Sequence, residues 1–112
     1  MAKGDFLGEF ELYVMLALSH QSPEAYGVTI RREIEARTGR TIAIGAVYAT
    51  LARLEEKSLV EFRISDPEPV QGGRAKKYYD LTRAGARALR HSTAMLARMI
   101  DGLAPELQGG KW

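Results

Sequence analysis

The chain has 112 residues, a formal net charge of +2 and no cysteine. That length fits one small domain with a modest core, and the lack of cysteine excludes disulfides and thiolate metal cages. The first residues contain no long uncharged apolar run, so we expect neither a signal peptide nor a membrane span, and we expect a cytoplasmic protein. The basic residues gather in residues 66–90, which hold six Lys/Arg against three Asp/Glu. Such a segment is either a phosphate-binding surface or an ordinary solvated loop.

Residues 6–18 predict the first helix, because apolar side chains recur at helical spacing. One stripe comprises Phe6, Phe10, Tyr13, Val14, Ala17 and Leu18, and it is widened by Leu7, Leu12, Met15 and Leu16. A helix that is apolar nearly all round is buried on more than one side. Its second side therefore packs either on another subunit or under the last helix of its own chain.

The second helix is predicted from Pro23 or Ala25 to Thr38. Residues 22–24 offer a capping hydroxyl, a proline and an acid in the order that suits a helix start. Gly39 fits the left-handed position that ends a helix. Residues 40–42 then form a turn as short as those of helix-turn-helix units.

The third helix is predicted over residues 43–58, with an apolar stripe of Ile44, Val47, Tyr48, Leu51 and Leu54. The opposite stripe has small residues first and cations last: Ala46, Thr50, Arg53 and Lys57. Small side chains let a helix approach the base edges of a DNA major groove. The ring of Tyr48 belongs either to the core or to the edge of the stripe, where its hydroxyl could reach a phosphate.

A hairpin follows, because residues 59–64 and 76–81 each alternate between apolar and polar side chains. Residues 65–75 hold two prolines and two adjacent glycines, which predicts a loop. The far side of this loop carries Arg74, Lys76 and Lys77, and Gly73 permits a close approach to another backbone. A helix followed by a basic hairpin is the winged-helix pattern.

The last helix is predicted to begin at a Thr82 cap and to continue to about Gly102. Leucines repeat every seven residues along it, at Leu89, Leu96 and Leu103, and the seam is broadened by Thr93, Met95, Met99 and Ile100. This is the spacing of coiled coils. The helix is therefore either a dimerisation helix or a core helix of a monomer.

These elements predict a mainly α protein with a small antiparallel β-hairpin, of the α+β class. We expect a winged helix-turn-helix domain over residues 1–81, a dimerisation helix over 82–103 and a flexible tail over 104–112. His20 and His91 lie on different elements, and the sequence contains no metal-site or catalytic motif of a common kind. We therefore expect no enzymatic activity, no cofactor and no metal.

Three segments carry a family resemblance: LGEFELYVMLAL, AYGVTIRREIEARTGRTIAIGAVYATLARLEEKSLVE and GGRAKKYYDLTRAGARAL. Together they resemble the PadR family of bacterial transcriptional regulators, in the compact subgroup with one C-terminal helix. The resemblance implies a winged-helix DNA-binding domain, a homodimer built by the last helix and a two-fold promoter site. One departure is Ser58, where the family usually has glycine.

The resemblance also implies an effector pocket at the dimer interface for a small aromatic molecule. In this chain it would be lined by Phe6, Phe10, Met95, Met99 and Trp112. The same side chains could equally belong to the core, and nothing in their spacing selects a ligand.

The leading hypothesis is a dimeric, sequence-specific DNA-binding regulator, a repressor that a small molecule releases. Its two recognition helices would enter successive major grooves of double-stranded DNA, about 34–36 Å apart. Base edges would meet Ala46 and Thr50, and phosphates or guanine would meet Arg53 and Lys57. The expected DNA-binding set is Ala46, Tyr48, Thr50, Arg53, Lys57, Gly73, Arg74, Lys76 and Lys77, and the expected dimer interface is Leu7, Leu89, Leu96, Ile100 and Leu103.

A rival hypothesis is a winged helix that binds proteins or sequesters a ligand and has no DNA role. The alanines along the third helix favour it, because Ala46, Ala49 and Ala52 cannot identify bases through polar contacts. The basic wing and the small front of that helix count against it.

Overall fold

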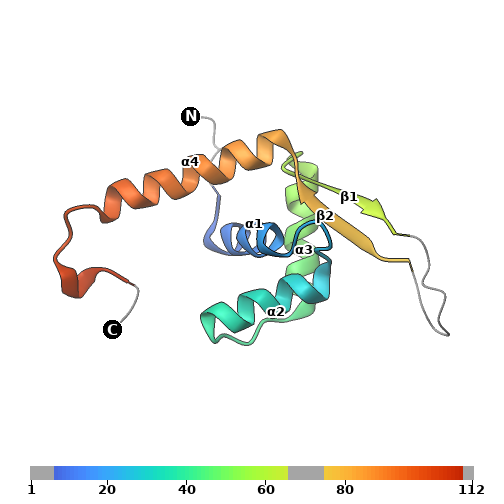
Figure 1. Ribbon diagram of the computed structural model, residues 1–112, viewed down its shortest axis with the longest axis horizontal. Coiled ribbons are helices and arrows are strands. Elements are labelled where there is room, and N and C mark those ends of the chain that lie inside the picture. The colour runs from blue at the N-terminus through green and yellow to red at the C-terminus, as the bar shows by residue number, and fades with distance from the viewer. Residues whose placement is uncertain (1–6, 66–74, 110–112) are drawn as a thin grey trace.

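The computed structural model describes residues 7–65 and 75–109 (Figure 1). The chain forms three helices, a hairpin and a long last helix. In order they are α1 (Glu9–Gln21), α2 (Gly27–Thr38), α3 (Ile44–Glu56), β1 (Val60–Ile64), β2 (Lys77–Leu81), α4 (Arg83–Ile100) and the short 3-10 helix η2 (Pro105–Leu107). This order confirms the predicted fold class, mainly α with one antiparallel hairpin.

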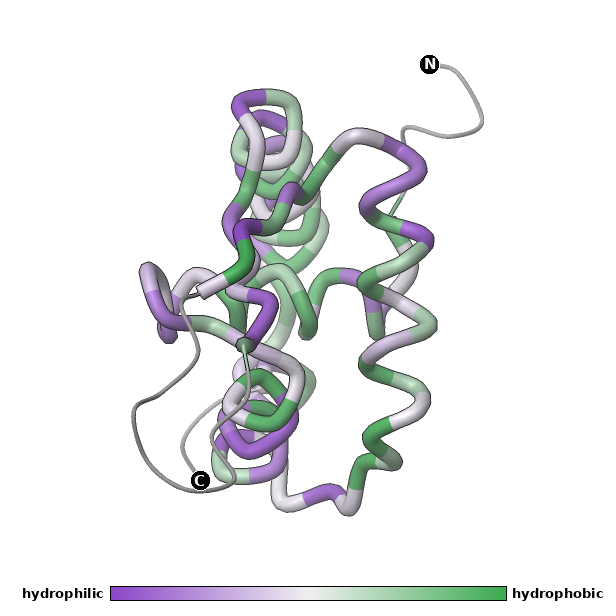
Figure 2. Tube along the Cα trace, turned by 90° about the vertical axis from the view of Figure 1, so that its right-hand side faces the viewer, coloured by the Kyte–Doolittle hydropathy of each residue, from purple (hydrophilic) through white to green (hydrophobic). Residues whose placement is uncertain are grey.

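The core lies where α1, α2 and α3 meet, and the base of the hairpin closes it. In Figure 2, α1, α2 and α4 are seen nearly end-on in a stack, and α3 stands upright beside them. The largest fully buried side chains come from all three of the first helices: Val14, Met15, Leu18, Ile30, Val47, Thr50, Leu51 and Leu54. The apolar periodicity of the sequence therefore located most of this core.

The connector between α1 and α2 differs from the prediction, since α2 begins at Gly27 rather than at Pro23 or Ala25. Tyr79 of β2 donates its N–H to the carbonyl of Ala25 at 2.8 Å. This bond to the wing keeps the connector extended, so the helix starts later. The predicted left-handed end at Gly39 is confirmed, with φ of 73°.

The hairpin pairs antiparallel, from Val60 opposite Leu81 to Ile64 opposite Lys77. Its predicted inner face is buried only near the body, because Val60 and Tyr79 are buried whereas Phe62 and Ile64 are exposed. The loop that carries Gly73 and Arg74 lies outside the described residues.

Thr82 caps α4 as predicted, since its hydroxyl accepts the N–H of Gly85 at 2.9 Å. Gly85 is buried, and a methyl group in its place would overlap the carbonyl oxygen of Leu59. Only the first half of α4 packs on the body, where Ala84, Ala88 and Leu89 touch the core. The second half extends past the body (Figure 1).

Beyond α4, the chain turns at Gly102, which has a φ of 83°, and forms η2 in a segment expected to lack regular structure. The Gln108 amide donates to the Leu103 carbonyl at 2.9 Å and holds this turn against the end of α4. Among the helices that the structure describes, none is long and apolar enough to cross a bilayer.

Candidate nucleic-acid interface

The outward face of α3 is made of small side chains. The helix buries Val47, Thr50, Leu51 and Leu54, and it exposes Gly45, Ala46, Ala49, Ala52 and Arg53. No side chain between Gly45 and Ala49 on this face extends beyond a methyl group. The backbone of α3 can therefore approach a flat or concave partner closely.

Thr50 does not belong to this face, and the prediction that it meets base edges is wrong. Its side chain is only 1% exposed, and its hydroxyl accepts a hydrogen bond from Arg53 Nη2 at 3.1 Å. The buried stripe of α3 is centred on Val47, Leu51 and Leu54, and Thr50 falls within its width because successive residues are about 100° apart. Arg53 is exposed and reaches back over Thr50.

Tyr48 lies on the flank of α3 rather than in the core, with 47% of its surface exposed. Its ring rests on Gly27, where a methyl group would overlap the ring and the hydroxyl oxygen. Gly27 thus creates the space that lets Tyr48 lie flat against the start of α2. The sequence left the position of Tyr48 open and gave no signal for the role of Gly27.

A hollow of about 220 Å³ opens beside Tyr48, where α2, α3 and the hairpin meet. Its lining comprises Tyr26, Gly27, Tyr48, Ala75, Lys76 and Lys77. The start of α2 carries no acidic residue in its first turn, so its positive dipole end is not offset there. Two tyrosines, two lysines and a helix start make this a suitable place for an anion.

Cations of the hairpin rest on aromatic rings. Lys77 Nζ lies 4.1 Å from the centroid of the Phe62 ring, and Lys76 Nζ lies 4.6 Å from that of Tyr26. Arg63, which the sequence analysis did not single out, lies 4.7 Å from the centroid of the Tyr78 ring. Such contacts hold long side chains in place while leaving their charge at the surface.

Lys57 lies at the end of α3, as the residue after its last turn. Its Nζ lies 2.9 Å from Oε2 of Glu11 on α1, and the other carboxylate oxygen accepts the N–H of Gly8 at 2.9 Å. Burial alone would raise the pKa of Glu11, but these two hydrogen bonds and the charges of Lys57 and Arg53 outweigh it and lower the pKa. The structure therefore ties Lys57 to α1 and not to the small face of α3.

The residues expected at a dimer interface fall into two groups. Leu7 and Leu89 are half-buried against the core of their own chain, whereas Leu96, Ile100 and Leu103 are exposed. Leu96, Ile100 and Met99, which is 78% exposed, form an apolar face on the outer half of α4, and Leu103 lies just beyond the end of the helix.

Of the expected effector residues, Met95 is half-buried on α4, and Phe10 lines a hollow that faces the start of α3. That hollow is bounded by Glu9, Phe10, Arg40, Thr41, Ile42, Ala43 and Ala46. Among the described residues that line it, none is a methionine of α4. Phe6 and Trp112 lie outside the described residues.

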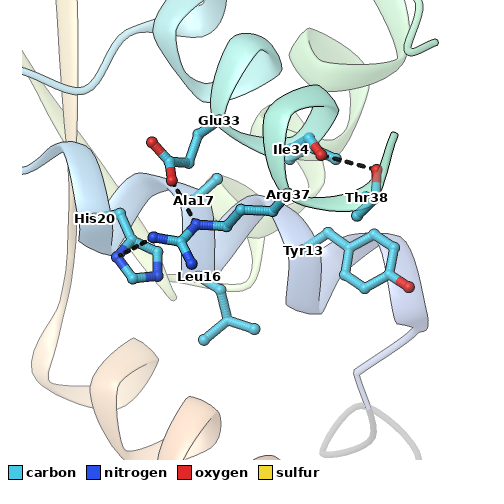
Figure 3. Close-up of a pocket in the computed structure, with 8 residues that line it drawn as sticks. All are labelled: Tyr13, Leu16, Ala17, His20, Glu33, Ile34, Arg37 and Thr38. Carbon is cyan, nitrogen blue, oxygen red and sulfur yellow. Dashed lines mark hydrogen bonds and ion pairs between the residues drawn. The ribbon is translucent and has the colours of Figure 1, made fainter. Parts of the chain in front are cut away.

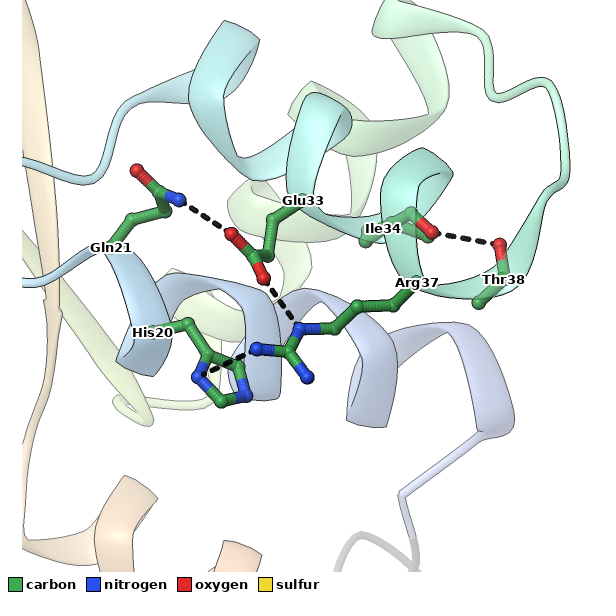
Figure 4. Close-up of polar contacts among 6 residues, drawn as sticks. All are labelled: His20, Gln21, Glu33, Ile34, Arg37 and Thr38. Carbon is green, nitrogen blue, oxygen red and sulfur yellow. Dashed lines mark hydrogen bonds and ion pairs between the residues drawn. The ribbon is translucent and has the colours of Figure 1, made fainter. Parts of the chain in front are cut away.

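A groove runs between α1 and α2 and has a volume of about 240 Å³ (Figure 3). Tyr13, Leu16, Ala17 and Ile34 contribute to its lining, and Leu16 is exposed. Polar side chains close its rim in a chain of contacts (Figure 4). Arg37 pairs with Glu33 and lies 3.3 Å from His20 Nδ1, and the Gln21 amide donates to Glu33 at 2.6 Å.

Comparison with known proteins assigns the family. The model of the PadR-like family of transcriptional regulators matches residues 15–91. A PadR family regulator from Clostridium difficile R20291 is 26% identical with a TM-score of 0.70, over 82% of this chain and 91% of that one. A PadR family regulator from Eggerthella lenta DSM 2243 is 30% identical with a TM-score of 0.65, over 90% and 89%.

RosR of H. salinarum is also similar, at 26% identity and a TM-score of 0.65 over 88% of this chain and 81% of that one. No curated protein sequence matches significantly. The family is one of regulators and not of enzymes, and its members bind DNA. The family match over residues 15–91 and the shared winged-helix fold together show that this chain belongs to the PadR-like transcriptional regulators.

Proposed function

We propose that the protein binds a two-fold DNA site as a homodimer and represses transcription until a small molecule releases it. DNA binding by a PadR-family regulator follows from the family. The observation that carries the finer proposal is the exposed face of α3, where Gly45, Ala46 and Ala49 present no bulky side chain.

In this proposal the small face of α3 enters the major groove. The methyl groups of Ala46 and Ala49 can contact thymine methyls, and Arg53 stands beside them to reach guanine or a phosphate. Few direct base contacts are then available. Much of the affinity would come from phosphates, and it would fall steeply with added salt.

The flanking backbone would be held by the hollow beside Tyr48. Tyr48, Lys76 and Lys77 are among the residues that line one opening of about 220 Å³. We propose that a phosphate occupies it, with Arg63 on the neighbouring strand as a further contact. Gly73 and Arg74, in the segment outside the described residues, remain part of the proposed contact set.

A second copy would cover the outer half of α4. Leu96, Met99 and Ile100 continue the stripe by which Ala88 and Leu89 pack on the body, but they are exposed. Exposed apolar side chains in such a row are typical of an interface. Hence we infer that the first part of the stripe packs on its own chain and that the last part packs on the partner.

We further infer where the end of the partner helix lies. The groove between α1 and α2 has an apolar floor around Leu16 and carries His20 and Arg37 at its rim. The end of α4 carries exposed apolar side chains, and Asp101 and Glu106 lie in the segment that follows it. This match between two apolar surfaces supports the groove as its seat.

The proposed effector site would also depend on the dimer. Met99 is almost fully exposed in one chain, so only a second copy can enclose it. We propose that Phe10, Met95 and Met99 line a pocket for a small aromatic molecule between the helices of two copies, together with Phe6 and Trp112. Binding there would change the distance between the two α3 helices and weaken the complex with DNA.

The proposed DNA-contacting face can be tested with one charge. The wild-type protein would first select a duplex from a random-sequence library, and its affinity for that duplex would be measured by fluorescence anisotropy. Ala49→Glu places a carboxylate on the exposed face of α3, against the phosphates, and should weaken binding by roughly a hundredfold. Ala94→Glu, on the exposed outer side of α4, is the matched control and should bind like the wild type. Equal affinity of both variants would remove α3 from the interface.

A further inference from the structure

We infer that Lys57 is a positioning residue, which fixes the end of the recognition helix α3 to α1 through Glu11 and does not contact DNA. This inference rests on the proposed function, because it concerns how the two copies of α3 are held for DNA binding. It also replaces the sequence-based assignment of Lys57 to phosphate or guanine.

The ion pair joins two elements that are distant in the sequence. Lys57 lies one residue past the end of α3, and its N–H closes the helix on the carbonyl of Arg53 at 3.1 Å. Its side chain then crosses to α1, where Nζ lies 2.9 Å from Glu11 Oε2. Ser58 follows with a φ of 62°, so the chain turns away at once.

Glu11 depends on this partner because it is almost buried. Only 8% of its surface is exposed, and its carboxylate oxygens are held by Lys57 and by the N–H of Gly8. A phosphate would compete with Glu11 for the Lys57 ammonium, and full transfer of the lysine to it would require leaving Glu11. That exchange would leave a buried carboxylate without its cation, which is strongly unfavourable.

The position of Lys57 on α3 leads to the same conclusion. The C-terminal end of a helix carries a partial negative charge, which attracts lysine and repels phosphate. The small face, from Gly45 to Ala49, lies at the opposite end of α3. Lys57 therefore lies where α3 meets α1, away from the part of α3 that is shaped for the groove.

The pair links the two halves of the proposed mechanism. α1 borders the groove proposed for the partner helix, and α3 is the proposed recognition helix. Since Glu11 and Lys57 join them directly, the pair sets how far the end of α3 stands from the two-fold axis. A protein without the pair should tolerate a wider range of half-site spacings.

The test compares Lys57→Met, Glu11→Gln and Arg53→Met on the duplex selected by the wild-type protein. Affinity would be measured at several salt concentrations, and again on a duplex with one base pair inserted at its centre. Each phosphate contact contributes about 0.9 to the slope of log K against log salt concentration. Thermal unfolding of each variant would confirm that it is folded.

We expect Lys57→Met and Glu11→Gln to keep the wild-type salt slope and to lose affinity about equally, by roughly three- to tenfold. Both should discriminate less between the two spacings, and Arg53→Met should lower the slope by about 0.9 per subunit. The decisive variant is Glu11→Gln. If Lys57 contacts DNA, removing Glu11 releases the lysine and affinity rises.

A rise in affinity for Glu11→Gln, or a slope lowered by about 0.9 per subunit for Lys57→Met, would overturn the inference. Failure of the wild-type protein to select any duplex would instead contradict the proposed function. The two failures are therefore distinguishable.

Discussion

The exposed face of α3 and the outer half of α4 are both open surfaces, but their chemistry is opposite. On this face of α3 the residues are glycine and alanine, with Arg53 beside them. On α4 they are Leu96, Met99 and Ile100, which are among the largest apolar side chains that the described part of the chain leaves exposed.

The two surfaces are exposed for different reasons. Leaving small side chains in water costs little, so α3 can remain uncovered until a nucleic acid arrives. Leaving a row of large apolar side chains in water is costly, so α4 should be covered most of the time. The first surface suits a partner that comes and goes, and the second suits a lasting one.

The substitution with the largest expected effect lies where β2 meets α4, and it should disrupt both surfaces together. Gly85→Val would force a side chain into the carbonyl oxygen of Leu59, and backbone cannot yield as a flexible side chain can. We expect a loss of more than about 4 kcal/mol in the free energy of unfolding, at the severe end for a single substitution. Denaturant unfolding followed by circular dichroism would measure it.

Gly45→Ala is the matched control for that experiment, because a methyl group at Gly45 would meet no atom within 4 Å. It should leave stability unchanged or raise it by up to about 1 kcal/mol. Equal stability of the Gly85→Val variant and the wild type would show that α4 does not depend on this close approach.

The next largest effect concerns the apolar face of α4 alone. Leu96→Glu puts a charge into the proposed seam and should weaken the dimer by at least about a hundredfold, since an unpaired charge cannot be buried cheaply. The monomer should stay folded, because Leu96 is 50% exposed within one chain. Sedimentation velocity would measure the association.

Ala94→Glu carries the same new charge on the other side of α4 and should leave the dimer intact. DNA affinity should fall for Leu96→Glu as well, because two linked recognition helices bind far better than separate ones. An unchanged dimer would show that this face of α4 is not the interface.

The smallest effect would sharpen the description of the α3 surface. Tyr48→Phe removes one hydroxyl from the hollow beside α2 and keeps the ring on Gly27. Loss of one hydrogen bond to a phosphate should lower DNA affinity about fivefold, or about 1 kcal/mol. Anisotropy titration would detect this, whereas the melting temperature should not move.

Ser19→Ala is its control, because it removes a hydroxyl that bonds to the Met15 carbonyl within α1 and lines neither the hollow nor the groove. It should bind DNA as the wild type does. A Tyr48→Phe variant with full affinity would mean that the hydroxyl makes no contact with the duplex.

Local patterns in the sequence sufficed for much of the fold. The stripe of Val47, Leu51 and Leu54, the cap at Thr82 and the left-handed Gly39 all depend on neighbours within a few residues, and the structure confirms them. The alternation of the two strands likewise predicted which residues form the hairpin.

What the sequence missed depends on contacts between distant residues. The contact between Lys57 and Glu11 left no local signal, because the two residues are 46 positions apart. The start of α2 was placed too early because the connector bonds to β2 through Ala25 and Tyr79. Thr50 was assigned to the exposed face for a different reason. An apolar stripe covers a range of angles around the helix, so its edges cannot be located to within one residue.

Two bonds at the base of the wing involve no side chain: Tyr79 N–H to the Ala25 carbonyl at 2.8 Å joins the wing to the body, and Thr82 N–H to the Leu59 carbonyl at 3.1 Å closes the hairpin. Main-chain bonds are kept whatever residue occupies the position, proline excepted. Exposed residues of the two strands can therefore be substituted without a change in the orientation of the wing relative to the body. Relatives could differ in operator preference through changes in wing side chains alone, while the main chain of the wing keeps the same arrangement.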